Sequence, residues 1–250
     1  MQPCKSKDVI CIMQYPAIII SFMEIEGMHG WDLKPPEARL LQEMLAGNVV
    51  RSNIAIRPQT IAGIDVSVSR FSRTGRAAVV VLSYPSLELI DIATAEDEIN
   101  FPYIPGLLSF WEAPLVIKAF QKLNCRPDMI MVDGQGIAHP RRLGIASHLG
   151  LFMDIISIGC AKSRLIGTHD SLPPEKGASK PLIDQDEIIG AVVRTKHAVN
   201  PLFISIGHKI DLNQSVSFVL SCCRGFRLPE PTRLAHMAAC GTLKSNKLVS

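Results

Sequence analysis

Residues 131 to 142 read Met-Val-Asp-Gly-Gln-Gly-Ile-Ala-His-Pro-Arg-Arg, and this stretch decides the predicted fold. Apolar residues run into it from Pro127, which is typical of a short buried strand. Asp133 stands where that strand should end, and Gly134 and Gly136 permit a tight turn or the close approach of a ligand. A carboxylate at the tip of a central strand, above a glycine turn and two arginines, suits a metal ion and a phosphate.

Two other interpretations apply to the same stretch. Aspartate is a common N-cap, so Asp133 could instead begin the following helix. The glycine loop could also be a dinucleotide-binding fingerprint, but the third glycine of G-x-G-x-x-G would fall at position 139, which is His139. A nicotinamide-binding enzyme is therefore disfavoured.

The composition is ordinary for a globular protein. The 250 residues are 47% hydrophobic and 20% charged, which is enough for a real core in one large domain or two small ones. The formal net charge of +3 is too small to indicate nucleic-acid binding by itself. Any such site must come from local clustering of charge.

The cysteines are odd in number, lie in apolar runs and form no C-x-x-C pair. We interpret them as reduced core thiols of a cytosolic protein. The seven are Cys4, Cys11, Cys125, Cys160, Cys222, Cys223 and Cys240. The histidines show no H-E-x-x-H motif and no Cys/His zinc spacing.

Residues 1–28 differ from the rest of the chain. The run from Val9 to Met23 is strongly apolar, like a signal-peptide core, but no A-x-A cleavage site follows it. Pro16 interrupts the run, which is also short for a membrane span. We interpret residues 1–28 as an extension that need not be native, translated from an upstream start, with Met28 as a sensible first residue.

The first half of the chain predicts a helix followed by a meander. Pro35 and Pro36 open the helix, and Gly47 is its predicted C-cap. Its predicted apolar stripe is Leu40, Leu41, Met44 and Leu45. Strands over residues 61–69, 77–82 and 87–92, joined by short turns, indicate three antiparallel neighbours.

Two carboxylates in this half stand at distinctive places. Ile64, Val66 and Val68 alternate with polar residues, so Asp65 should point away from the side that holds those three. After a stiff loop over residues 101–106, residues 107–111 predict one helical turn. Pro114 then predicts the start of the next helix, with Glu112 near its N-terminal end, where a negative charge is favourable.

The second half alternates strands with helices. Residues 144–152 predict a helix and residues 155–160 a buried strand, and Lys162 and Arg164 follow that strand directly. Residues 172–184 read as an exposed loop, residues 188–194 and 202–210 as a strand hairpin across residues 196–201, and residues 215–223 as a helix. A short helix then reaches His236. This order favours an α/β fold with a mixed sheet covered on both faces. We predict a single domain over residues 29–240, with a disordered tail over residues 241–250.

Three of these carboxylates could form one metal site. Asp65, Glu112 and Asp133 could together hold one or two Mg²⁺ ions, which prefer hard oxygen ligands. Such a site activates water and neutralises charge on a phosphodiester. Lys162 and His236 could orient the nucleophile or steady the leaving oxygen. The side chains that could hold neighbouring phosphates are Arg141, Arg142 and Arg164.

The chain resembles the endonuclease V family, the deoxyinosine 3′ endonucleases. The long motif over residues 132–144 and the Pro-Tyr-Ile-Pro-Gly loop from Pro102 carry most of this resemblance. The matching stretches span about residues 30–240 in the family's order; they are 62–67, 84–89, 102–110, 132–144, 159–162 and 227–233. The resemblance implies an RNase H-like mixed β-sheet flanked by helices on both faces.

The resemblance also implies an activity. The family nicks DNA at the second phosphodiester bond 3′ to deoxyinosine and other deaminated bases during DNA repair, leaving 3′-hydroxyl and 5′-phosphate ends. We expect a monomeric cytoplasmic enzyme with Mg²⁺ as cofactor, Mn²⁺ as a substitute and no membrane partner. An endoribonuclease acting mainly on inosine-containing RNA is an alternative. A lesion-binding protein with little turnover is a further alternative, which would require that one of the carboxylates Asp65, Glu112 and Asp133 be missing.

By the same resemblance, Asp65 and Asp133 would be metal ligands, and Glu112 would complete the acidic site through a water molecule. Lys162 and His236 match positions near the metal and the cleaved phosphate. The expected lesion-binding residues are Tyr103, Pro102, Ile104, Gly106, Leu108, Gly134, His139 and Ile145. Tyr103 would be the wedge that fills the gap left by the flipped base. Trp111 departs from the family, whose members commonly carry arginine there.

Overall fold

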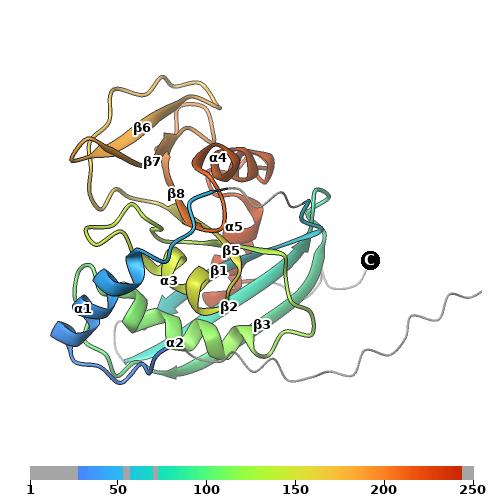
Figure 1. Cartoon of the computed structure of the whole chain (residues 1–250). Coiled ribbons are helices and arrows are strands. Elements are labelled where there is room, and N and C mark those ends of the chain that lie inside the picture. The colour runs from blue at the N-terminus through green and yellow to red at the C-terminus, as the bar shows by residue number, and fades with distance from the viewer. Residues whose placement is uncertain (1–27, 53–56, 70–72, 244–250) are drawn as a thin grey trace, which may run out of the picture.

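A computed structural model describes residues 28–52, 57–69 and 73–243 of the chain (Figure 1). The predicted extension over residues 1–28 and the predicted tail over residues 241–250 lie outside this part, apart from Met28 and residues 241–243. Thr242 and Leu243 donate backbone hydrogen bonds to the Met237 carbonyl, at 2.8 and 3.1 Å, so these two residues stay attached to the last helix.

The described residues form five helices and eight strands. The helices are α1 (Pro35–Ala46), α2 (Leu108–Phe120), α3 (Ile145–Phe152), α4 (Leu212–Ser221) and α5 (Glu230–Ala239). The strands are β1 (Thr60–Val68), β2 (Thr74–Ser83), β3 (Leu89–Glu98), β4 (Met129–Val132), β5 (Ile156–Ala161), β6 (Ser179–Asp184), β7 (Glu187–Val193) and β8 (Leu202–His208). None of the helices described is long and apolar enough to cross a membrane.

All eight strands belong to one mixed sheet, in the order β3-β2-β1-β4-β5-β8-β7-β6. The predicted meander is confirmed, because β1 pairs antiparallel with β2 and β2 with β3. The central pairs β1–β4 and β4–β5 are parallel. The predicted hairpin of β7 and β8 is confirmed as an antiparallel pair.

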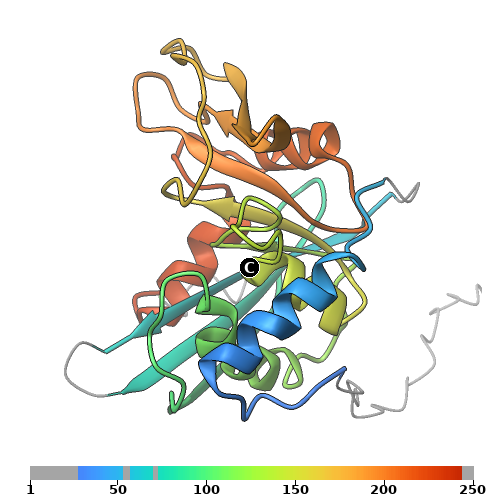
Figure 2. The ribbon, with the colours of Figure 1, turned by 60° about the vertical axis from the view of Figure 1, so that its left-hand side comes forward.

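Helices cover both faces of this sheet, as predicted (Figures 1 and 2). On one face, α2 and α3 pack on Ile64, Ile130 and Val132. On the other face, α4 and α5 pack on the alternate residues of the same strands, which include Ile61 and Met131. Each central strand therefore has two buried sides, which explains the continuous apolar runs in its sequence.

Strand register places the two aspartates together. In the parallel pair of β1 and β4, Gly63 lies opposite Met131 and Ile64 lies opposite Val132. One step further, Asp65 and Asp133 are neighbours, and the Asp133 N–H donates to the Ile64 carbonyl at 3.0 Å. Because side chains alternate along a strand, both aspartates share the α5 face of the sheet.

The prediction that a helix begins at Pro114 is wrong. One helix, α2, runs from Leu108 through Pro114 to Phe120, so Glu112 is its fifth residue and not an N-terminal charge. Phe110 in the first turn is buried with Leu107 against Ala38 of α1. This packing keeps the helix continuous past a proline that cannot donate its backbone hydrogen bond.

The predicted loop over residues 172–184 is also wrong in its last part, because Ser179–Asp184 is strand β6. This strand is the last in the sheet order and pairs with β7; on its other side, Ile183 forms one isolated bridge with Thr168. Pro181 is tolerated there because that side of the strand carries no continuous ladder. Buried Leu182 attaches the strand to Ile189 of β7.

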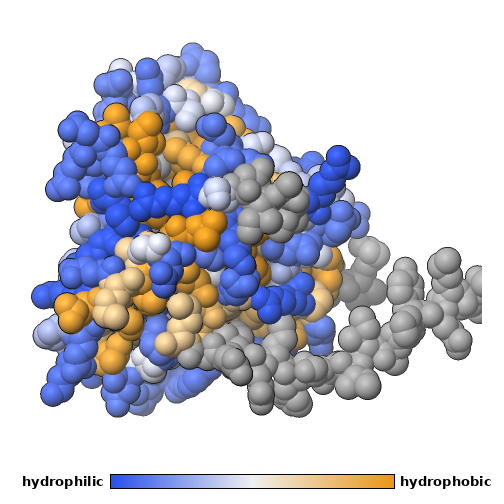
Figure 3. Space-filling model, in the orientation of Figure 1, coloured by the Kyte–Doolittle hydropathy of each residue, from blue (hydrophilic) through white to orange (hydrophobic). Residues whose placement is uncertain are grey.

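Helix α1 buries only part of the predicted stripe. Leu40 and Met44 are 61% and 72% exposed, whereas Ala38, Gln42 and Leu45 are buried. Gln42 belongs to the buried face because its amide donates to the Leu143 carbonyl at 3.0 Å. Figure 3 shows hydrophobic residues at the surface over the part of the molecule that holds α1 and α2.

The prediction that the cysteines are core thiols holds for some positions only. The described cysteines are free, and Cys160, Cys222 and Cys223 are buried. Cys240, in contrast, is exposed at the end of α5, and Cys125 is half-buried. Cys4 and Cys11 lie outside the described residues.

Gly63 permits the close approach of α5 to β1. A Cβ atom at this position would lie 1.9 Å from the Pro231 carbonyl oxygen. We therefore expect Gly63→Ala to lower the free energy of unfolding by about 1–3 kcal/mol, because backbone must move. Urea unfolding followed by circular dichroism measures the change.

Gly47→Ala is the matched control for this substitution. Gly47 has a helical φ of −66°, and nothing lies within 4 Å of the added Cβ atom. Its unfolding free energy should stay equal or rise slightly. Equal stabilities of the two variants would contradict the close contact between α5 and β1.

Candidate active site

Two aspartates and two basic side chains form the centre of the candidate site. Asp65 accepts a hydrogen bond of 2.7 Å from Nδ1 of His236, which comes from α5. Asp133 forms an ion pair with the ammonium group of Lys162, which follows β5. The side chains of Asp65 and Asp133 are 10% and 9% exposed. Four predicted catalytic residues therefore meet where β1, β4 and β5 lie side by side.

Lys162 is held through its backbone as well as its side chain. A guanidinium nitrogen of Arg227 donates to the carbonyls of Lys162 and Pro201, at 2.6 and 2.9 Å. Arg227 precedes α5, so one side chain joins the helix that carries His236 to the segment that carries Lys162. This bridge explains why residues after 227 contribute to the site.

The electrostatics of the site show an excess of negative charge. Burial and the neighbouring Asp133 raise the pKa of Asp65, against the hydrogen bond from His236. Burial raises the pKa of Glu112 well above its usual value, and repulsion from Asp65 and Asp133 adds to this. Burial opposes the charge of Lys162, but attraction to Asp133 outweighs it and raises the pKa of Lys162.

This charge pattern fits a divalent cation. Asp133 raises the pKa of Asp65, both aspartates raise the pKa of Glu112, and Glu112 has no hydrogen-bond or ion-pair partner within the described part of the chain. Hard carboxylate oxygens are the ligands that Mg²⁺ prefers. No group of three or more Asp, Glu, His and Cys side chains among the described residues is already gathered at metal-binding spacing. Glu112 therefore adds charge to the two aspartates without closing a three-ligand cage.

A cavity of about 370 Å³ opens beside the aspartates. It is lined by Asp65, Asp133 and Lys162 together with residues from the Pro-Tyr-Ile-Pro-Gly loop, α2 and α3. The predicted lesion-binding residues in its lining are Tyr103, Ile104, Gly106, Leu108, Gly134, His139 and Ile145. The tertiary structure thus brings together all but one residue of that predicted set.

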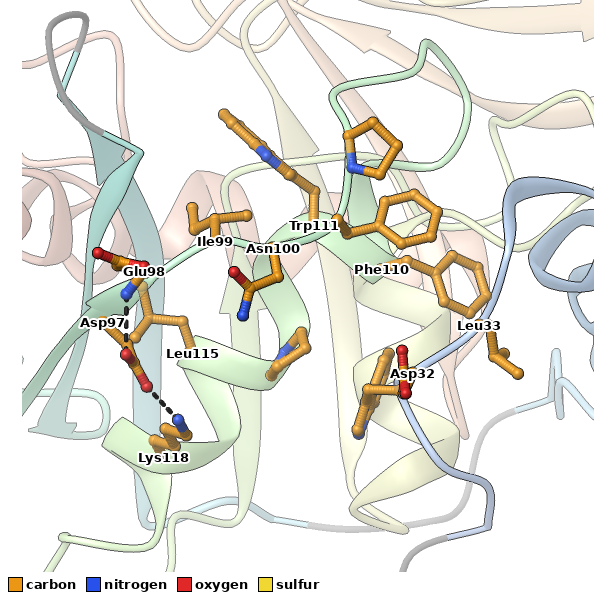
Figure 4. Close-up of a pocket in the computed structure, with 14 residues that line it drawn as sticks. Asp32, Leu33, Asp97, Glu98, Ile99, Asn100, Phe110, Trp111, Leu115 and Lys118 are labelled. Atoms are coloured by element: carbon orange, nitrogen blue, oxygen red, sulfur yellow. Dashed lines mark hydrogen bonds and ion pairs between the residues drawn. The ribbon is translucent and has the colours of Figure 1, made fainter.

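Pro102, the remaining member, faces a different cavity. This second cavity of about 490 Å³ lies between the start of α2, the end of β3 and the residues before α1 (Figure 4). Trp111 also lines it, and its ring meets the ring of Tyr103 edge to face, with centroids 5.2 Å apart. Tyr103 is 64% exposed, so Trp111 supports a side chain that projects into solvent.

His139 orients the loop that contains Gly106. Its Nε2 donates to the Gly106 carbonyl at 3.0 Å, and its Nδ1 accepts from the Arg141 N–H at 3.2 Å. Burial and nearby Arg141 lower the pKa of His139 to about 4, which keeps the ring neutral for this arrangement. Gly106 itself has a φ of +80°, a left-handed conformation that favours glycine.

The two arginines after His139 are engaged within the chain. Arg141 donates to the Gly106 carbonyl and to Oε1 of Gln42, at 2.6 and 2.7 Å. Arg142 pairs with Asp184 and Glu187 on the β6–β7 hairpin, at 2.9 and 2.6 Å. The structure thus gives both arginines a role in holding loops, and their contact with phosphates stays a prediction.

Arg164 differs from these two. It lines the cavity, is exposed, and has no hydrogen-bond or ion-pair partner among the residues that the structure describes. Its guanidinium group is therefore available to a phosphate.

Several cavity residues had no recognisable signal in the sequence. Ser109 and Leu165 line the cavity, but a serine in an apolar helix and a leucine in a loop are unremarkable by type. Gln42 lies about a hundred positions before the motif that it contacts, and only a polar residue on the buried side of α1 could have indicated it. The alternative role of Asp133 as a helix cap is excluded, because Gly144 is the N-cap of α3.

Comparisons with known proteins agree with this geometry. The family model described as Endonuclease V matches residues 43–237. An endonuclease V of Dehalococcoides mccartyi is 53% identical over 217 residues, which are 87% of this chain and 97% of that protein. An endonuclease V of Gloeobacter violaceus is 49% identical over 213 residues, covering 84% of this chain and 87% of that protein.

Solved structures give the same result. The endonuclease V of Streptomyces avermitilis superimposes with a TM-score of 0.81 at 36% identity, covering 87% of this chain and 96% of that one. The endonuclease V of Ciona intestinalis, solved in complex with a 23mer DNA containing an inosine followed by a ribo-adenosine, superimposes with a TM-score of 0.73 at 28% identity. That match covers 82% of this chain and 95% of the other. The mixed sheet has the RNase H-like fold of these proteins, and the chain belongs to the endonuclease V family of nucleases.

Proposed function

We propose that the protein is a metal-dependent endonuclease of DNA repair that nicks DNA at the second phosphodiester bond 3′ to deoxyinosine and other deaminated bases. It acts as a cytoplasmic monomer and uses Mg²⁺, which Mn²⁺ can replace. The observation that carries the proposal is one cavity with Asp65 and Asp133 on one wall and the exposed ring of Tyr103 at another. The complex of the Ciona intestinalis relative with inosine-containing DNA supports the choice of lesion.

Asp65 and Asp133 would hold the metal ion, with Glu112 acting on it through water. When bound, the ion supplies charge neutralisation and Lewis-acid polarisation at the phosphate. Lys162 is paired with Asp133 and stands at the cavity, where its ammonium group can donate to a phosphate oxygen. His236 donates its Nδ1–H to Asp65, so a neutral His236 keeps Nε2 as its proton-accepting atom.

The cavity would receive the deaminated base. Its volume of about 370 Å³ lies within the usual size range of small-ligand sites. His139 and Arg141 hold the Gly106 carbonyl and thereby the loop that forms one wall. Gly134 and Ile145 form another wall, next to the aspartates. A base turned out of the helix would place its 3′ phosphates near the acidic centre.

Tyr103 would fill the gap that the flipped base leaves in the stack. We expect Tyr103→Ala to weaken binding to a deoxyinosine duplex by about tenfold or more, because an aromatic ring stacked on a base contributes about 1–3 kcal/mol. Fluorescence anisotropy with the labelled duplex measures this change. Tyr103→Phe keeps the ring and should bind like the unchanged protein; equal affinity of the alanine variant would remove the wedge role.

An endoribonuclease acting on inosine-containing RNA is the second candidate. The DNA bound to the Ciona intestinalis protein carries a ribo-adenosine after the inosine, so that relative accommodates a 2′-hydroxyl next to the lesion. A 2′-hydroxyl is the group by which a protein distinguishes RNA from DNA. An RNA substrate therefore belongs in the functional assay.

A nicking assay with end-labelled strands tests the proposal. Matched duplexes with and without one deoxyinosine, and an inosine-containing RNA, are incubated with Mg²⁺, with Mn²⁺ or with a chelator. The expected result is one cut, one nucleotide beyond the deoxyinosine, with either ion and none with the chelator. Cutting of the undamaged duplex at the same rate would refute lesion specificity, and faster cutting of the RNA would favour the second candidate.

A further inference from the structure

His148 lies in the middle of a hydrogen-bonded chain outside the acidic centre. It belongs to α3, is 1% exposed and packs against aromatic rings. Its ring centroid lies 5.0 Å from that of Trp31 and 5.2 Å from that of Phe110. Nδ1 contacts the Ser109 hydroxyl at 3.0 Å, and Nε2 contacts Nε2 of His29 at 2.8 Å. Both ring nitrogens of a fully buried histidine are therefore in use.

The directions of these hydrogen bonds follow from one fixed acceptor. Nδ1 of His29 lies 2.8 Å from the Gly30 carbonyl, which can only accept, so this nitrogen carries a proton. Nε2 of a neutral His29 must then accept, and Nε2 of His148 must donate. Nδ1 of His148 is left as an acceptor, and the Ser109 hydroxyl donates to it. With both rings neutral, this arrangement of protons satisfies every member of the hydrogen-bonded chain.

His148 stays neutral in this environment. Burial, and then the neighbouring His29, lower the pKa of His148 to about 3. With the proton of the neutral ring on Nε2, Nδ1 accepts the hydrogen bond from the Ser109 hydroxyl. This bond joins α3 to α2.

That contact matters because the first turn of α2 has no cap of its own. Its N-cap residue, Leu107, makes no side-chain capping bond, and the preceding Gly106 is in the left-handed region. Leu108 and Ser109 of this turn line the cavity proposed for the base. Ile145, which begins α3, lines it too. The bond between Ser109 and His148 thus joins two walls of the same cavity.

His29 and Trp31 come from the residues before α1, and these lie outside the matched range of the family model, which begins at residue 43. The ring of Trp31 covers His148 and Phe152, with centroids 5.0 and 5.2 Å apart. Without His29, the Nε2–H of His148 would be a buried donor with no partner, which is unfavourable. The segment from His29 to Trp31 therefore anchors the outer end of this hydrogen-bonded chain.

We propose that His29, His148 and Ser109 form a positioning chain that fixes the first turn of α2 and thereby sets how strongly the base cavity discriminates deoxyinosine from normal bases. These residues act through the cavity wall and take no part in bond cleavage. The inference rests on the proposed function, because it presupposes that the cavity receives the base.

Two amide variants of His148 separate the two ends of the chain. In His148→Asn, the side-chain oxygen can replace Nδ1 and still accept from Ser109. In His148→Gln, the amide NH₂ can replace Nε2–H and still donate to His29. The readout is the ratio of dissociation constants for an undamaged and a deoxyinosine duplex, measured without divalent metal. Val219→Ala in the distant core of α4 controls for general loss of stability.

We expect Ser109→Ala and His148→Gln to lower this ratio by about fivefold to tenfold, the usual effect of losing one neutral hydrogen bond and its positioning. His148→Asn keeps the bond to Ser109 but loses the bond to His29, so it should lower the ratio by a smaller factor, and Val219→Ala should leave the ratio unchanged. An unchanged ratio in both Ser109→Ala and His148→Gln would overturn the proposal. Equal binding of both duplexes by the unchanged protein would instead be a failure of the proposed function.

A second measurement tests the hydrogen-bonded chain directly, in the protein without DNA. Two-dimensional ¹⁵N–¹H spectra of the histidine rings distinguish the two neutral forms and the charged form. We expect His148 to be neutral with its proton on Nε2. A proton on Nδ1, or a charged ring near neutral pH, would overturn the proposal even if a variant failed to fold.

Discussion

Asp133→Asn is expected to lower the rate of nicking of a deoxyinosine duplex by about 10³-fold. A bound divalent ion contributes several kcal/mol of charge stabilisation to the transition state, and each 1.36 kcal/mol is about a factor of ten in rate. Asp133 is one of two adjacent carboxylates on the central parallel strands, and the amide that replaces it has no charge. Single-turnover kinetics with saturating protein measure the loss.

Asp133→Asn should slow the cleavage step and leave DNA binding nearly unchanged. Binding of the deoxyinosine duplex should stay within about twofold, because the walls of the cavity are unchanged and one negative charge near the phosphates is removed. Asp170→Asn, in an exposed loop, is the control and should cut normally. Normal cutting by Asp133→Asn would show that the metal site lies elsewhere.

Glu112→Gln is expected to have opposite effects on stability and activity. The pKa of Glu112 is raised in the folded protein by burial and by Asp65 and Asp133. A group with a raised folded pKa contributes stability at low pH and loses it as pH rises through that pKa. At neutral pH without metal, the glutamine variant should therefore unfold at a temperature several degrees higher than the unchanged protein. The difference should vanish towards about pH 4.

Mg²⁺ should reverse the order of the two unfolding temperatures. A ligand that binds only the folded state stabilises it, so Mg²⁺ should raise the unfolding temperature of the unchanged protein more than that of Glu112→Gln. Nicking by the variant should fall at the same time. Scanning calorimetry across pH, with and without Mg²⁺, measures both effects. A variant that is less stable than the unchanged protein at neutral pH without metal would contradict the crowding of three carboxylates.

Periodicity in the sequence predicted the part of the site built on strands. Alternation along residues 61–69 placed Asp65 on the side opposite Ile64, and the structure confirms this, since Asp65 faces His236 on α5. The apolar run before Asp133 predicted a buried central strand, and β4 is fully buried. Such predictions succeed because a strand between two layers allows each residue only two directions.

Predictions based on local sequence signals alone were wrong where packing against distant segments determines the secondary structure. Pro114 indicated a helix start, but burial of Phe110 against α1 extends α2 by six residues before it. The polar, proline-containing run over residues 172–184 indicated a loop, but pairing with β7 makes its end an edge strand. In both segments, contacts with residues far away in the sequence outweigh the local preference.

By itself, the sequence determined the alternation of strands and helices, the places of Asp65 and Asp133 on strands or strand ends, and the resemblance to a nuclease family. Strand pairing in the tertiary structure makes the two aspartates neighbours. Only the tertiary structure decided that Arg141 and Arg142 hold loops, that Glu112 stands inside a helix against both aspartates, and that His148 joins the residues before α1 to the cavity wall. The physical reason is range: backbone periodicity acts between neighbours in the chain, whereas the partner of a charged or hydrogen-bonding side chain depends on which distant segments fold beside it.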